Sequence, residues 1–261
     1  MFLSHADSDH IGGANTLLLN TSLCVRCVFL NPDSTKDTVV FQQLRYALTE
    51  AEHRAGTRIE PSLTTNTKVP RRGALIEVLY PPASTALGGV GGSGLSGNRL
   101  TSNSLSAAIR VTGAEESSVL LGGDIEFGCL ECWKERGITP SARALVFPHH
   151  GGLPGDADES GAALFAHQLS ALVRPEIVIF SIHRTKFGLP RNEVVEAVLQ
   201  AVKDVRFICT QLPERFQHSV ANESAWSLHL NESGSGYCEG GIKLEFSDHK
   251  LSARFLCTND G

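Results

Sequence analysis

The sequence of 261 residues has little net charge, no long apolar run and an odd number of cysteines. No stretch approaches the roughly 18 apolar residues that a membrane-spanning helix needs. Lys and Arg total 23 against 28 Asp and Glu, and the resulting charge of −5 excludes a protein that coats nucleic acid with its whole surface. The first residues also lack the basic start and apolar core of a secretory signal. We therefore expect a soluble, cytoplasmic protein.

Seven cysteines cannot all pair, which argues against a secreted disulfide framework. Two pairs have the spacing C-x-x-C, Cys24 with Cys27 and Cys129 with Cys132, and together they could supply a four-thiolate zinc site. For both pairs we favour a role in packing over zinc binding. The first pair lies in a strand-like run, where a spacing of three points the side chains to opposite faces. The second pair lies in a helical run, where the thiols would pack as small apolar groups.

Apolar strand-like runs alternate with helical segments along most of the chain, which predicts a layered α/β fold. Strands are expected over 24–30, 74–80, 105–111, 118–122, 144–147, 177–182 and 205–210, and helices over 12–21, 41–56, 126–135, 162–173 and 192–202. The glycine-rich stretch 81–97 predicts a loop, which could be a linker or a flap over an active site. We place one domain over 1–212 and a β-rich extension over 213–261, which could also belong to the same domain.

Metal-competent side chains are most concentrated near the start of the chain. His5, Asp7, Asp9 and His10 place two imidazoles and two carboxylates within six residues. The two carboxylates would repel each other without a cation between them. Alternate residues of a short loop can point to one side, and His10 can then face a second ion. A solvated acidic loop is the plainer alternative.

Two later segments add polar groups directly after apolar runs. Asp124 follows an apolar strand and a glycine pair, which suits a carboxylate that bridges two metal ions. His149 and His150 follow another predicted strand, where one imidazole could bind metal while the other holds substrate. A Gly-Asp turn and a hydrogen-bonded strand end are the structural alternatives.

Taken in order, these segments resemble the motifs of the metallo-β-lactamase fold. The segment that begins at His5 is similar to the H-x-H-x-D-H signature in its H-x-D-x-D-H form, with Asp7 in place of the second histidine. The segments at Asp124 and His149-His150 resemble the L-L-T-G-D-x-E and V-P-H-H-G-S motifs, and Asn103–Ser106 resembles the N-x-S-x-V strand. The set is most similar to the hydrolase domain of ComEC-type competence proteins and their soluble relatives, over residues 1 to about 210.

The resemblance implies an αββα sandwich with two divalent ions, Zn or Mn, at the sheet edges. It assigns His5, Asp7 and His149 to one ion, Asp9 and His10 to the other, and Asp124 as the bridge, with Asp9 and Asp124 also catalytic. Metal-bound hydroxide would attack an ester, because a divalent ion lowers the pKa of bound water from 15.7 toward about 7. Which of His149 and His150 binds metal stays open, and three carboxylates make a relatively hard site that suits manganese as well as zinc.

The resemblance implies a phosphodiester substrate, for which DNA is one candidate. The lack of a long apolar run leads us to expect no membrane partner. His150, His183, Arg184 and Lys186 are the expected substrate-binding residues, with Arg191 as a further phosphate contact. A solvated basic loop is equally compatible with that segment. Lactones, thioesters or cyclic nucleotides would use the same metal ligands, and a small-molecule ester is therefore an alternative substrate.

Several departures from the family pattern leave a second class of function open. Between His10 and Asp124 the only histidine is His53, which we place on the surface of a helix. Leu189 stands where relatives have another histidine, and His183 could take its role. The first motif begins at residue 5, so we expect a chain truncated at its N-terminus that lacks the first strands of the fold. These losses leave open a degenerate protein that binds metal or a partner without catalysis.

Overall fold

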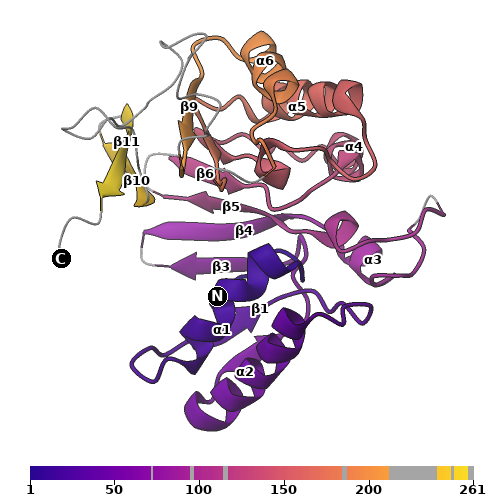
Figure 1. The fold of residues 1–261 in the computed structure, drawn as a ribbon, viewed down its shortest axis with the longest axis vertical. Coiled ribbons are helices and arrows are strands. Elements are labelled where there is room, and N and C mark those ends of the chain that lie inside the picture. The colour runs from indigo at the N-terminus through magenta and orange to yellow at the C-terminus, as the bar shows by residue number, and fades with distance from the viewer. Residues whose placement is uncertain are drawn as a thin grey trace. The chain divides into compact units, whose positions relative to one another are not determined.

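A computed structural model describes residues 1–71, 73–94, 97–113, 117–183, 187–211, 240–247 and 250–257. The fold is mixed α/β, as predicted, and its central sheet pairs seven strands in the order β3-β4-β5-β6-β7-β8-β9 (Figure 1). The strands are β1 (Cys27–Phe29), β2 (Arg58–Glu60), β3 (Lys68–Arg71), β4 (Ala74–Tyr80), β5 (Ala108–Thr112), β6 (Ser118–Leu121), β7 (Ala144–Val146), β8 (Ile177–Phe180), β9 (Arg206–Cys209), β10 (Gly240–Ser247) and β11 (Lys250–Cys257). The helices are α1 (Ser8–Leu19), α2 (Val39–Ala55), α3 (Ala83–Ala86), α4 (Phe127–Arg136), α5 (Glu159–Val173) and α6 (Asn192–Ala201).

The chain divides into two compact units. Unit 1 comprises Met1–Val69, Ile76–Ile109 and Gly123–Cys129, and unit 2 comprises Pro70–Leu75, Arg110–Gly122 and Leu130–Gly261. The domain boundary expected at residue 212 falls within 212–239, outside the described residues, and stays a prediction.

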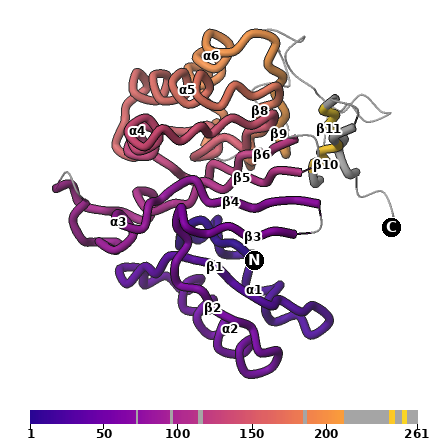
Figure 2. The backbone as a smooth tube through the Cα atoms, turned by 180° about the vertical axis from the view of Figure 1, so that it is seen from behind, coloured from indigo at the N-terminus to yellow at the C-terminus, as the bar shows by residue number. Residues whose placement is uncertain are grey.

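Unit 1 is layered on both faces of the short parallel pair β1-β2. Successive residues of a strand point to opposite faces. Val28 therefore packs toward α1 and α2, while Phe29 stacks on Phe2 at 4.7 Å between ring centroids and packs toward β4 and β5. On the helix side, Ile11, Ala14 and Leu18 recur at the spacing of one helical face and are buried against α2. Figure 2 shows α1 and α2 beside β1 and β2 in the indigo part of the chain.

The ends of α2 follow from its sequence. Thr38 caps the first turn by accepting a hydrogen bond from the backbone N–H of Phe41 at 3.2 Å. Gly56 ends the helix in the left-handed region at φ +62°, a conformation that glycine adopts without the strain of a Cβ. The cap at Thr38 thus defines where the loop between β1 and α2 ends.

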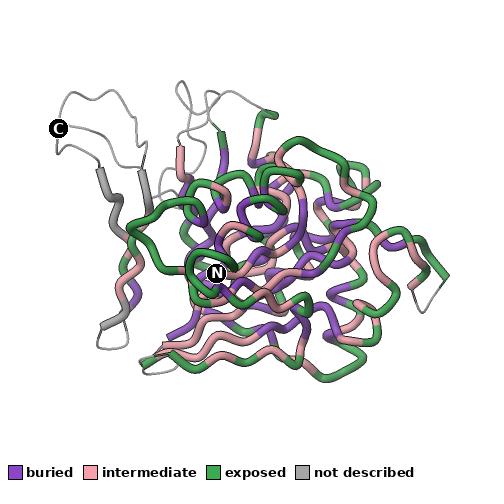
Figure 3. The backbone as a smooth tube through the Cα atoms, turned by 90° about the horizontal axis from the view of Figure 1, so that it is seen from below, coloured by how far each residue is buried: buried purple, intermediate pink, exposed green. Residues whose placement is uncertain are grey.

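Unit 2 is built on four parallel strands, β6 to β9. Every residue of β8 is buried, as expected of a parallel strand that is covered on both faces. The antiparallel pair β10-β11 packs its Leu251 against Ala144, Ile177 and Ile208 on one face. Phe165 and Leu169 of α5 belong to the buried core. Figure 3 colours the buried parts of the backbone purple.

The cysteines do not form the alternative thiolate site within the described part of the chain. Cys24 is exposed, Cys27 is half-buried, and no candidate metal-binding group among the described residues includes a thiol. Among the same residues, no helix combines the length and apolar character needed to cross a membrane.

Candidate metal centre

Backbone pairing on two sides positions His5 in unit 1. The N–H of Leu3 donates to the carbonyl of Phe29 on β1 at 3.0 Å, and the N–H of Ala107 donates to the carbonyl of Ser4 at 3.0 Å. The extended segment before α1 is thus held between β1 and the start of β5. His5 directly follows these two anchored residues, and it is only 4% exposed.

The other side chains of the first motif come from the beginning of α1. Asp7 occupies the N-cap position, and its carbonyl accepts hydrogen bonds from the N–H groups of His10 and Ile11. An aspartate at this position commonly caps the helix with its side chain, but Asp7 makes no such bond. Its carboxylate is therefore available to the site, together with Asp9 and His10 from the first turn.

Asp124 reaches the same place from more than a hundred residues further along the chain. Its backbone N–H donates to Ser106 Oγ at 2.8 Å, and that oxygen also lies 3.1 Å from His5 Nδ1. Gly123 just before it has φ +56°, and a Cβ there would lie 2.6 Å from Ser106 Oγ. Only glycine fits this close approach, which sets the carboxylate against the two imidazoles.

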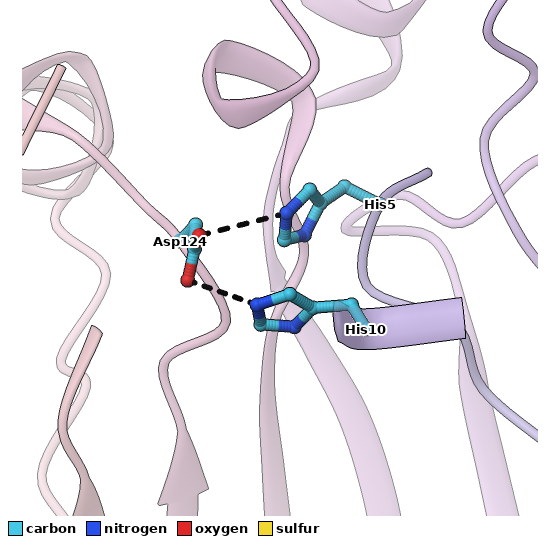
Figure 4. Close-up of side chains that lie close together, drawn as sticks. All are labelled: His5, His10 and Asp124. Carbon is cyan, nitrogen blue, oxygen red and sulfur yellow. Dashed lines mark ion pairs between the residues drawn. The ribbon is translucent and has the colours of Figure 1, made fainter. Parts of the chain in front are cut away.

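The two oxygens of Asp124 face different histidines (Figure 4). Oδ2 lies 3.6 Å from His5 Nε2, and Oδ1 lies 3.3 Å from His10 Nε2. Each imidazole has a second carboxylate beside the same nitrogen: Asp7 Oδ2 at 3.8 Å from His5 and Asp9 Oδ2 at 3.6 Å from His10. The result is two His-Asp groups that share the Asp124 carboxylate.

Serine hydroxyls lie at the opposite ring nitrogens. Ser4 Oγ is 3.1 Å from His5 Nδ1 and 3.4 Å from His10 Nδ1. A proton on Nδ1 that is donated to a serine oxygen leaves the Nε2 lone pair facing the carboxylates. Metal-binding histidines are commonly oriented in this way by the groups around them.

Burial keeps His5 neutral. Removal from water, followed by the nearby charge of His10, lowers the pKa of His5 from 6.5 to about 4, against the opposing effect of Asp124, Asp7 and Asp9. At neutral pH the ring therefore carries no positive charge and can act as a ligand.

The residues fit divalent metal ions. Around a four-coordinate ion with bonds of about 2.0–2.1 Å, ligand atoms lie roughly 3.3–3.4 Å apart. The nitrogen-oxygen separations of 3.3–3.8 Å are close to that spacing and exceed a direct hydrogen bond of about 2.9 Å. Among the described residues, the buried His5 Nε2 has no hydrogen-bond partner, which is costly for a polar atom unless a ligand binds there. Imidazole nitrogens and carboxylate oxygens suit zinc or manganese.

The remaining predicted site residues belong to unit 2. His149 and His150 lie on the turn Pro148–Gly151, both in the left-handed region at φ 51° and 56°, and His150 Nδ1 is 2.5 Å from the carbonyl oxygen of Ser181. His183 is exposed, and Arg184 and Lys186 lie outside the described residues. The roles expected for these five residues stay predictions.

Three functional neighbours were not assigned from the sequence. Ser4 and Ser106 contact the imidazoles, and the ammonium of Lys36 lies 2.5 Å from Asp7 Oδ1. Ser4 directly precedes the first motif, and Ser106 ends the segment that resembles N-x-S-x-V. Both serines could therefore have been predicted from the sequence to lie near the centre. Nothing in the local sequence singles out Lys36. His53 is exposed on α2, as predicted.

Comparisons with known proteins give only distant similarities. No family model matches the chain, and no curated protein matches it significantly. Among solved structures, a mutant of the β-hydroxylase CmlA matches with a TM-score of 0.44 and 13% identity, over 80% of this chain and 42% of that chain. CmlA from Streptomyces venezuelae, a diiron β-hydroxylase, matches at 0.39 and 13%, over 77% of this chain and 37% of its own.

A third structure, titled a possible metal-dependent hydrolase from Veillonella parvula, matches with a TM-score of 0.36 and 9% identity, over 80% of this chain and 60% of that chain. The chain thus spans less than two thirds of the length of each of these proteins. Likeness at these scores is too weak to assign a family.

Proposed function

We propose that the protein is a metal-dependent hydrolase whose centre holds two divalent ions and acts on an ester, with a phosphodiester as the substrate. One observation carries the proposal: the two oxygens of Asp124 face different imidazoles, and each imidazole has its own second carboxylate. A single structural ion would not need a carboxylate shared in this way. Two-metal sites that hydrolyse esters place their ions about 3.5–4 Å apart, a separation that one bridging carboxylate can span.

Two divalent ions would lower the pKa of a water molecule toward neutrality and polarise the ester oxygen. The residues of the chain have separate roles around them. His5 and Asp7 would hold one ion, His10 and Asp9 the other, and Asp124 would bind both. Ser4 and Ser106 orient the rings. The side chain of Asp9 is 61% exposed, so it is also placed to accept a proton from a water molecule that attacks from solvent.

Support for a phosphodiester comes from the motif resemblance and from the donor set. Three carboxylates and two imidazoles form a hard, anionic group that favours ions able to bind phosphate oxygens. Arg191, the further phosphate contact expected from the sequence, is instead paired with Glu159 and Glu193. His150, His183, Arg184 and Lys186 remain the proposed substrate contacts.

The experiment measures metal content and turnover together. Purified protein is stripped with chelator, reloaded with Mn²⁺ or Zn²⁺, and assayed on bis(p-nitrophenyl) phosphate and single-stranded DNA. We expect two ions per chain and metal-dependent cleavage. Asp124→Asn should reduce the bound metal and lower the rate by a factor of 100 or more, about 2.7 kcal/mol of barrier. Asp37→Asn is the matched control, because its carboxylate is exposed and accepts a hydrogen bond from the side chain of Gln42 at 2.8 Å.

Each result separates the candidates. Failure to bind metal would refute the centre. Two bound ions without cleavage of either phosphodiester, but with turnover of a lactone or thioester, would keep the hydrolase and replace the substrate. Bound metal with no turnover of any ester would instead support the non-catalytic metal-binding alternative.

A further inference from the structure

Lys36 contacts a proposed metal ligand although no motif includes it. Its Nζ lies 2.5 Å from Asp7 Oδ1, while the other oxygen, Oδ2, faces His5 Nε2 at 3.8 Å. The two oxygens of Asp7 therefore have different partners. Both side chains are only partly accessible, 26% for Lys36 and 31% for Asp7, so the pair is less screened than an ordinary surface ion pair.

A buried polar turn fixes the backbone that carries Lys36. The carboxylate of Asp33, 3% exposed, accepts hydrogen bonds from the N–H and the hydroxyl of Thr35, at 2.9 and 2.6 Å, and from Ser102 Oγ. Burial alone would raise the pKa of Asp33, but the hydrogen bonds from Ser102 and Thr35, with the charge of Lys36, hold it below its ordinary value. Asp33 is thus an ionised, fully bonded anchor just before Lys36.

Asn31 ties the same turn to the interior of unit 1. Its side-chain amide donates to the carbonyl of Leu63 at 2.9 Å, and its oxygen accepts from the N–H of Leu63 at 2.8 Å. A further bond from its amide reaches the carbonyl of Leu105 at 3.3 Å, one residue before Ser106 of the candidate centre. The turn and the centre therefore share one scaffold, and the long lysine side chain begins from a fixed point.

The local charge explains the use of an ammonium group here. Asp7, Asp9 and Asp124 lie close together around two imidazoles, of which His5 is neutral. A free aspartate can bind an ion through one oxygen or both, and it can rotate away. An ammonium on one oxygen restricts that choice and partly offsets the clustered negative charge.

We propose that Lys36 is a positioning residue that holds Oδ1 of Asp7, so that the carboxylate presents only Oδ2 to the ion of His5. The inference rests on the proposed two-ion centre. It concerns one of the two ions, since Lys36 contacts Asp7, the carboxylate that flanks His5, whereas Asp9 flanks His10. A lysine that instead competed with a metal ion for Asp7 would weaken metal binding, and its removal would strengthen it.

Isothermal titration of the chelator-stripped protein with Mn²⁺ tests this, because it resolves the two ions without an activity assay. In Lys36→Met we expect one ion to bind about 10- to 100-fold more weakly, the usual effect of removing a partner of a metal ligand, and the other to keep its affinity. Lys36→Arg, which retains a cationic donor, should restore the weakened ion to within a few-fold of wild type. Lys68→Met is the matched control, since Lys68 pairs with Glu77 at 3.0 Å in the same unit without touching the centre.

Asp33→Asn provides a second variant that retains the lysine and weakens only its anchor. It should weaken the same ion, by less than Lys36→Met, and circular dichroism checks that both variants fold. Unchanged or tighter Mn²⁺ binding in Lys36→Met would overturn the proposal, and so would equal weakening of both ions. A wild-type protein that binds no Mn²⁺ and no Zn²⁺ would instead refute the centre itself, and the role of Lys36 with it.

Discussion

The lowered pKa of His5 predicts that the metal-free protein loses stability in mild acid. In the unfolded chain His5 titrates near 6.5, while in the folded chain its pKa is about 4. Between these values the unfolded state binds a proton that the folded state does not, so stability rises with pH across this window and falls as pH drops. With about 1.4 kcal/mol for each pH unit, lowering the pH from 7.5 to 4 should cost roughly 3 kcal/mol from this one residue. Below pH 4 both states are protonated and the loss levels off.

Urea denaturation of the chelator-stripped protein, followed by circular dichroism, measures this loss at several pH values. His5→Gln removes the titrating ring, so its stability should fall by about 3 kcal/mol less than that of the wild type over the same range. His53→Gln is the control, because that ring is exposed on α2 and should leave the wild-type profile unchanged. Parallel profiles for wild type and His5→Gln would refute the reasoning, since they would mean that burial does not exclude the proton.

Two further substitutions test how the centre is supported. Ser106→Ala removes the oxygen that accepts a hydrogen bond from the Asp124 N–H and contacts His5. We expect the free energy of unfolding, measured in urea, to fall by about 1–3 kcal/mol and Mn²⁺ to bind roughly 10-fold more weakly or worse. An unchanged Mn²⁺ titration would contradict this. Gly123→Ala adds a Cβ 2.6 Å from Ser106 Oγ on a left-handed backbone, whereas a Cβ at Gly56, also left-handed, meets no atom within 4 Å. Both variants have backbone strain, but only Gly123→Ala adds a clash. It should therefore lower the free energy of unfolding by roughly 2 kcal/mol more than Gly56→Ala does. Equal losses in the two glycine variants, measured by urea denaturation, would show that crowding at the centre is unimportant.

Most of the fold could be predicted from the sequence because its elements have strong periodic patterns. The strand 74–80 coincides with β4, and the predicted helix 162–173 lies within α5, which begins three residues earlier at Glu159. The short strands β2 and β3 were missed, because three or four residues with half-exposed side chains carry no clear alternation. The start of α1 was also misplaced: a helix was expected only from residue 12, after the His5–His10 loop, yet it begins at Ser8. Burial of Ile11 and Leu18 outweighs the helix cost of Gly12 and Gly13.

The candidate centre was only partly predictable. Clustering of His5, Asp7, Asp9 and His10 was visible because these candidate ligands are close together in the chain. The structure places the Asp124 carboxylate 3.3–3.6 Å from the two imidazoles. The left-handed backbone of His149 and His150 could not be foreseen, because positive φ is uncommon for any residue other than glycine, even though histidine adopts it more often than most. Lys36 was missed for a related reason: its position depends on Asp33 and Asn31, which look like an ordinary Asn-Pro-Asp turn until their buried partners are known.

The centre joins the first residues of α1 to Asp124, a segment distant in the chain, and this has a kinetic consequence. A bound ion would link the two segments reversibly, because α1 could not move away from Asp124 without at least one ligand leaving the ion. Local opening of the helix and loss of metal would then be the same event. The rate at which amide hydrogens of α1 exchange with solvent deuterium would therefore report metal occupancy, residue by residue, in a protein whose substrate need not be known.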